Sequence, residues 1–74
     1  MTIDQFVENF ADLFDNAGSI NAQTPFKELP EWSSLMALSV IAMVDEEYDV
    51  SLKGIDVQNA VTVEDLFNAV KGKL

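Results

Sequence analysis

Apolar residues recur at helical spacing along the first part of the chain. From residue 3 to about residue 16 they stand three or four positions apart, and acidic residues occupy the remaining faces. Thr2 and Gln5 have the spacing of a capping box, and Gly18 suits a chain reversal after the last turn. We therefore predict an amphipathic helix that buries an aromatic stripe. The stripe consists of Ile3, Phe6, Val7, Phe10, Leu13 and Phe14.

A second helix is expected from Ser34 to about Asp49, and either Ser33 or Ser34 can cap its N-terminus. Its core side carries Ala37, Val40, Ile41, Val44 and Tyr48. The opposite side carries Leu35, Leu38, Ser39, Ala42, Asp45, Glu46 and Asp49. A strip of apolar side chains bordered by carboxylates should therefore face solvent, which is typical of a partner-binding surface.

A last helix is predicted from about Val63 to Lys71, with Thr62 as its N-cap. Its buried stripe is Val63, Leu66, Phe67 and Val70. Residues 17–33 are expected to form a long loop that Phe26, Leu29 and Trp32 anchor to the core. Residues 50–61 are irregular, with one possible helical turn at 56–60. The prediction is an all-α fold, a small bundle of three to four helices with a long first loop, in a single domain spanning 1–74.

The composition is strongly acidic and lacks several catalytic residue types. The 74 residues include 13 Asp and Glu against four Lys, for a net charge of -9, and they contain no His, Arg or Cys. Such a surface repels nucleic acids and anionic membranes and favours basic protein partners. No stretch approaches a membrane span, and no basic signal-peptide region precedes an apolar one, so we expect a cytoplasmic protein. Without His or Cys an enzymatic role is disfavoured.

A calcium site is also disfavoured. Asp45, Glu47 and Asp49 have the alternate spacing of a calcium loop, but Val50 stands where that loop requires Gly. These carboxylates are better interpreted as the solvated end of a helix, and we predict no metal site.

The segment Ser33-Ser34-Leu35 is the most informative part of the sequence. It places a hydroxyl at the start of a helix, next to backbone N–H groups that have no intrahelical partner. A phosphodiester at this position would be favoured by the helix dipole. The simpler interpretation, in which both serines only cap the helix, stays open on this feature alone.

Residues 26–63, and more loosely the whole chain, resemble the acyl carrier proteins. That family carries Asp-Ser-Leu at the start of its second helix, where this chain has Ser33-Ser34-Leu35. The acidic helix end at residues 42–49 and Thr62-Val63 before the last helix are also similar. The resemblance implies that Ser34 carries 4'-phosphopantetheine, which a separate phosphopantetheinyl transferase adds from coenzyme A with magnesium.

The resemblance also implies a monomeric carrier that is not itself an enzyme. It would hold acyl intermediates as thioesters and deliver them to synthases and acyl-transferring enzymes of fatty-acid, polyketide or related biosynthesis. The positions that match the family's partner-facing side are Leu35, Leu38, Ala42, Asp45 and Glu46. The interior of the bundle could also shelter an acyl chain.

Ser33 stands where the family has Asp, so the carboxylate before Ser34 is missing. This departure motivates a second hypothesis, in which the chain is an unmodified, carrier-like helical adaptor that binds basic partner surfaces.

Overall fold

Four α-helices and two short 3-10 helices form the computed structural model, which describes residues 1–15 and 17–74. The α-helices are α1 (Ile3–Ala11), α2 (Ser34–Tyr48), α3 (Gly54–Asn59) and α4 (Val63–Lys71). The 3-10 helices are η1 (Ala17–Ser19) and η2 (Phe26–Glu28). No strand occurs within the described ranges. The predicted all-α bundle with a long first loop is confirmed.

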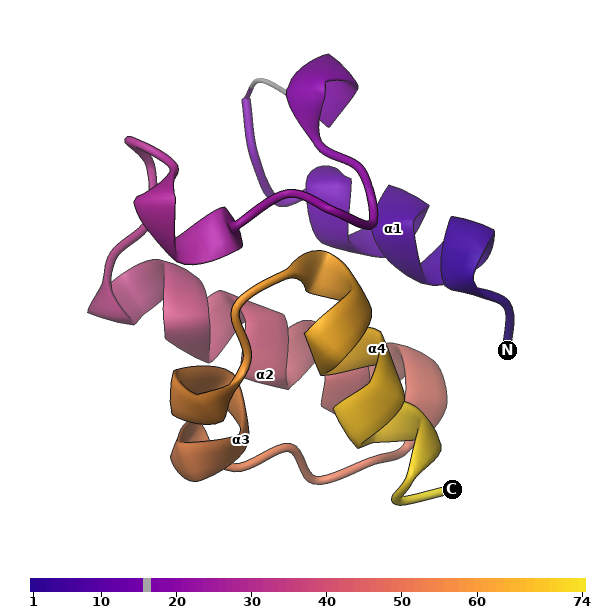
Figure 1. Cartoon of the computed structure of the whole chain (residues 1–74). Helices are drawn as coiled ribbons and strands as arrows, with labels where there is room; N and C mark the ends of the chain where they lie inside the picture. The colour runs from indigo at the N-terminus through magenta and orange to yellow at the C-terminus, as the bar shows by residue number, and fades with distance from the viewer. Residues whose placement is uncertain (16) are drawn as a thin grey trace.

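The helices pack in a closed ring of contacts, in which α1 and α3 each contact both α2 and α4. Figure 1 shows α4 crossing in front of α2. In this view α1 lies above α4, and α3 lies beside the first half of α2. The loop between α1 and α2 passes over the bundle, and η2 lies next to the start of α2. This arrangement brings the loop, α2 and α3 together near the N-terminus of α2.

Among the described residues the core is entirely apolar, and it is centred on aromatic side chains from α1. Phe6 and Phe10 are fully buried, and the Phe6 ring meets Phe67 of α4 at a centroid distance of 5.8 Å. Phe10 packs edge to face on Phe26 of η2 at 5.6 Å, and Phe26 in turn packs on Trp32 at 4.9 Å. The predicted anchors therefore do hold the long loop, with Phe26 fully buried and Trp32 and Leu29 half-buried. The apolar stripe predicted for α4 is buried as expected.

The first helix is shorter than predicted, since it ends at Ala11 instead of near residue 16. After Ala11 the chain tightens into turns, in which the Phe14 N–H donates to the Ala11 carbonyl at 2.9 Å. The Asp15 N–H then donates to the Glu31 carboxylate at 2.9 Å, which directs the chain into the loop. Phe14 stays in the core although it lies outside the helix. Asn16, the last residue of the predicted helix, lies outside the described residues.

The third helix is longer than the single turn predicted at residues 56–60, and it begins at Gly54. The Asp56 carboxylate accepts the Lys53 N–H at 2.9 Å and so closes the first turn. Val57 is buried and fixes the helix on the core. The backbone hydrogen bond from Lys53 lowers the pKa of Asp56 below its ordinary value.

The last helix begins with a reciprocal cap. Thr62 accepts the Asp65 N–H at 3.2 Å, and the Asp65 carboxylate accepts the N–H groups of Thr62 at 3.0 Å and Val61 at 2.9 Å. These hydrogen bonds hold the pKa of Asp65 below its ordinary value of 3.8, and the bond from the Thr62 N–H has the largest effect. The ionised carboxylate therefore stabilises the folded state.

This cap predicts a pH dependence of stability. Because the pKa of Asp65 is lowered on folding, its contribution is present above pH 3.8 and is lost as the pH falls toward the folded-state value. Asp65→Asn should be less stable than the native sequence at pH 7, and this difference should shrink below pH 3.8. Urea unfolding from pH 7 to pH 3 measures the free energy of unfolding of both proteins. The difference between the two values at each pH removes the contributions of the other titrating groups, which both proteins share. A difference that stays constant over this range would contradict the assigned cap.

Candidate functional site

Two adjacent serines at the start of α2 have different structural roles. Ser33 is the N-cap, in an extended conformation, and its hydroxyl accepts the Met36 N–H at 3.2 Å. Ser34 is the first residue of the helix, and its side chain is exposed. Within residues 1–15 and 17–74 its hydroxyl has no hydrogen-bond partner. The choice between the two serines as caps, which the sequence left open, therefore falls on Ser33.

The backbone around Ser34 favours an anion. The Ser33 hydroxyl satisfies Met36, and the Ser33 carbonyl accepts the Ala37 N–H at 3.0 Å. The N–H groups of Ser34 and Leu35 have no intrahelical acceptor, because they belong to the first turn. α2 has 15 residues, so its dipole adds a partial positive charge at this end. A phosphate carried by the Ser34 hydroxyl would lie next to both groups.

These roles predict that the two serines contribute unequally to stability. Ser33→Ala removes the cap and should lower the free energy of unfolding by about 0.5–2 kcal/mol. Ser34→Ala removes an exposed, unpaired hydroxyl and should change it by about 0.5 kcal/mol or less. Urea unfolding followed by circular dichroism compares the two variants. A larger loss in Ser34→Ala than in Ser33→Ala would mean that Ser34, not Ser33, caps the helix.

Ser34 lines a groove between α2 and α3, which has a volume of about 680 Å³. The loop contributes Lys27 and Trp32 to its lining, and α3 contributes Gly54, Val57 and Gln58. The α2 side consists of Ser34, Ala37, Leu38 and Ile41, with the cap residue Ser33 beside them. The volume lies within the range of small-molecule sites, and most of the lining surface is apolar. An apolar chain attached at Ser34 could therefore be accommodated beside its attachment point.

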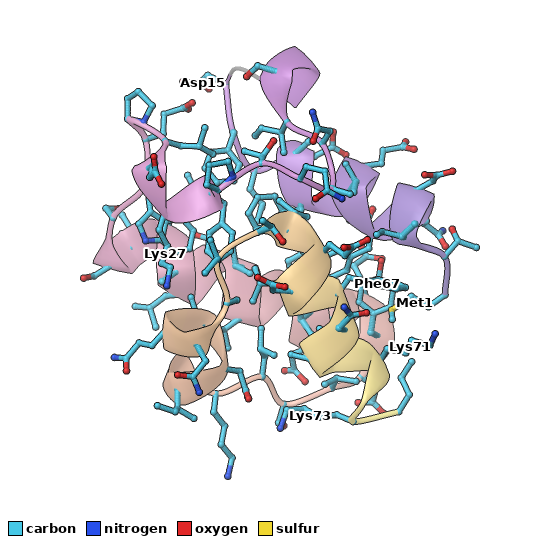
Figure 2. The ribbon with its side chains drawn as sticks, viewed as in Figure 1. Met1, Asp15, Lys27, Phe67, Lys71 and Lys73 are labelled. Atoms are coloured by element: carbon cyan, nitrogen blue, oxygen red, sulfur yellow. The ribbon has the colours of Figure 1, made fainter. Side chains whose placement is uncertain are left out.

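The Lys27 side chain forms part of the lining of this groove. Its ammonium donates to the Gln58 carbonyl of α3 at 2.7 Å and lies 6.0 Å from the centre of the Phe26 ring. Figure 2 shows its side chain extending from η2 toward α3. The contact joins the loop to α3.

The five predicted partner-facing residues all lie on the exposed side of α2. Leu35 and Leu38 are 74% and 63% exposed, so the predicted apolar strip does face solvent. Leu38 borders the groove against α3. Ala42 and Glu46 border a second groove of about 390 Å³ between α1 and α2, whereas Asp45 borders neither groove. The exposed strip of α2 thus lies between two grooves. Its role in partner binding stays a prediction.

The sequence did not reveal that Lys27 and α3 take part in the site. Lys27 was one residue of a loop, and α3 was expected only as a turn at its C-terminal half. Asp56 is a residue type that is favoured in the first turn of a helix, and its carboxylate accepts the Lys53 N–H, but nothing local shows that this helix packs beside Ser34.

Among residues 1–15 and 17–74, no three acidic side chains gather closely enough to hold a metal ion. None of the described helices has the length and apolarity that crossing a membrane requires.

Comparison of the chain with protein-family models, with curated proteins and with solved structures finds no match.

Proposed function

We propose that this chain is an acyl carrier protein in which Ser34 bears 4'-phosphopantetheine. The observation that carries the proposal is the Ser34 hydroxyl, which is exposed at the N-terminus of a long helix and has no hydrogen-bond partner in the part of the chain that the structure describes. Ser33 supplies the cap, so the neighbouring hydroxyl is free for another role. The apolar groove that begins beside Ser34 gives a tethered chain a place to lie.

Ser34 acts as the nucleophile when the arm is attached. Its Oγ forms a bond to the β-phosphorus of coenzyme A and loses its proton, while adenosine 3',5'-bisphosphate leaves with the electron pair of the broken P–O bond. A transferase supplies the base and the magnesium ion. The N–H groups of Ser34 and Leu35 and the helix dipole then favour the phosphodiester. The arm supplies a thiol for thioester formation, which this chain lacks because it has no Cys.

The surface around Ser34 suits enzymes with basic docking faces. The chain has a net charge of -9, and the exposed Leu35 and Leu38 lie on the same helix as Asp45 and Glu46. Opposite charges would speed the encounter, and the leucines would be buried on binding. The partners proposed are a phosphopantetheinyl transferase and the synthases and acyl-transferring enzymes of fatty-acid, polyketide or related pathways. The protein would act in the cytoplasm as a monomer.

Intact mass spectrometry tests the proposal. The protein is incubated with coenzyme A, magnesium and a broad-specificity phosphopantetheinyl transferase, and its intact mass should increase by that of one arm. Proteolysis followed by peptide mass spectrometry should locate this gain on the peptide that contains Ser34. A known carrier protein in the same reaction confirms that the transferase is active. No gain beside a fully loaded control would contradict the proposal.

The alternative is the unmodified adaptor, which the absence of a carboxylate at Ser33 favours. In that case the exposed strip of α2 would bind a basic partner without an arm. Intact mass of the protein purified from its native host separates the two functions. An arm on Ser34 excludes the adaptor, whereas a bare Ser34 in cells whose other carriers are loaded supports it.

A further inference from the structure

The groove beside Ser34 has a charge opposite to that of the rest of the chain. The chain has 13 acidic residues and four lysines, yet the groove is lined by Lys27 and by no acidic residue. The ammonium of Lys27 contacts a neutral carbonyl, that of Gln58, and no carboxylate of the described residues. By contrast, Lys73 pairs with Asp56 at 3.4 Å. The groove thus contains one positive charge without an anionic partner.

The contact with Gln58 orients this charge but does not use all of its donors. A lysine ammonium has three N–H groups, and the Gln58 carbonyl takes one of them. Two N–H groups remain for an anionic oxygen. Since the carbonyl and the Phe26 ring position the ammonium, an anion that enters the groove would meet a donor whose direction is already set.

The remaining lining is suited to an alkyl chain. Trp32, Ile41 and Val57 offer apolar surface, and Ser34, which also lines the groove, is the proposed attachment point of the arm. A free anion would be repelled by the net charge of -9. A tethered anion overcomes this repulsion, because the tether holds it at a high effective concentration. The geometry therefore suits an apolar chain that is attached at one end and ends in an anion.

We propose that Lys27 makes this groove selective for acyl groups that end in a carboxylate, such as half-thioesters of dicarboxylic acids. The proposal rests on the proposed function, because the acyl group must be carried on the thiol of an arm attached to Ser34. The terminal carboxylate accepts hydrogen bonds from the Lys27 ammonium while the methylene groups lie along the apolar lining. A simple fatty acyl group of equal length gains the apolar contacts alone.

The test compares pairs of acyl groups with matched length. The chain is loaded from glutaryl- or pentanoyl-coenzyme A, and from adipyl- or hexanoyl-coenzyme A, and thioester cleavage by hydroxylamine is followed by intact mass. Lys27→Gln keeps an N–H donor for Gln58 and removes the charge. The ratio of its cleavage rate to the native rate for each acyl group cancels intrinsic reactivity. We expect a ratio of about three to ten for the dicarboxylic groups, because the variant lacks one partly exposed charge-assisted hydrogen bond. For the simple groups we expect a ratio of about one.

Two variants separate the local charge from other effects. Lys27→Arg keeps the charge and should behave as the native sequence does. Lys71→Gln makes the same change in net charge at the end of α4, which Figure 2 shows on the other side of the molecule from Lys27. It should leave every ratio near one.

Three results would overturn the inference. Equal acceleration of both kinds of acyl group in Lys27→Gln would mean that Lys27 only joins the loop to α3. Ratios near one for all groups would mean that the terminal carboxylate does not reach Lys27. The third result combines equal cleavage-rate ratios for all acyl groups with a change in the ³¹P chemical shift of the Lys27→Gln protein that carries the arm without an acyl group. It would mean that Lys27 contacts the phosphate of the arm and not the acyl group. Failure of loading itself would instead contradict the proposed function.

Discussion

Ser34→Ala will gain no arm in the loading reaction, whereas Ser33→Ala will gain one. The first variant lacks the nucleophilic oxygen, so no bond to phosphorus can form, and the expected loss is complete. The second loses a cap that points into the helix but retains the exposed hydroxyl one residue later. Intact mass spectrometry after incubation with coenzyme A and a transferase measures both outcomes.

The two variants control for each other. Ser33→Ala is expected to be the less stable protein, so a loading failure confined to Ser34→Ala cannot come from unfolding. The reaction is run well below the unfolding midpoint of both, as found by circular dichroism. If Ser34→Ala gains an arm and Ser33→Ala does not, the attachment site is Ser33 and the site described above is wrong by one residue.

Phe10→Ala is expected to lose about half or more of the stability of the fold. Phe10 is fully buried, and its ring packs on Phe6 at 6.5 Å, Phe14 at 5.2 Å and Phe26 at 5.6 Å. Truncating a buried Phe costs about 3–5 kcal/mol. A domain of this length has a total stability of roughly 4–11 kcal/mol at about 0.05–0.15 kcal/mol per residue. Urea unfolding followed by circular dichroism should show a much lower midpoint or no folded baseline.

Phe10→Leu is the matched control, since it keeps an apolar side chain at the same place and leaves a smaller cavity. It should retain a cooperative transition between those of Phe10→Ala and the native sequence. The loop near Ser34 should respond as well, because Phe10 contacts Phe26 and Phe26 contacts Trp32. The fluorescence of Trp32 should therefore shift toward that of a solvated indole in Phe10→Ala. A loss below about 1 kcal/mol would contradict the central place given to Phe10.

The helices with clear local signals could be predicted from the sequence. α4 begins and ends where its apolar period and Thr62 indicated, because the cap and the buried stripe lie within one short segment. α2 ends one residue before the predicted Asp49, which instead takes a left-handed conformation with φ of 55° as the C-cap. The exposed leucines of α2 were also predicted, since they fall opposite its core side.

The end of α1 and the groove could not be predicted, because contacts distant in sequence determine them. The apolar period continues to Phe14, yet the chain leaves the helix earlier and Asp15 bonds to Glu31 of the loop. Similarly, the position of α3 beside Ser34 depends on packing of Val57 and on the link from Lys27 to Gln58. Neither contact leaves a periodic signal in its own segment. The candidate hydroxyl was thus predictable, whereas the cavity next to it was not.

The division of roles between Ser33 and Ser34 has a consequence for a protein that would be loaded and unloaded many times. The hydrogen bond that starts α2 belongs to one residue, and the free oxygen belongs to the next. A substituent on that oxygen takes no hydrogen bond away from the helix. The bare and the substituted protein can therefore keep the same backbone, and a change of cargo would require no refolding of the scaffold that presents it.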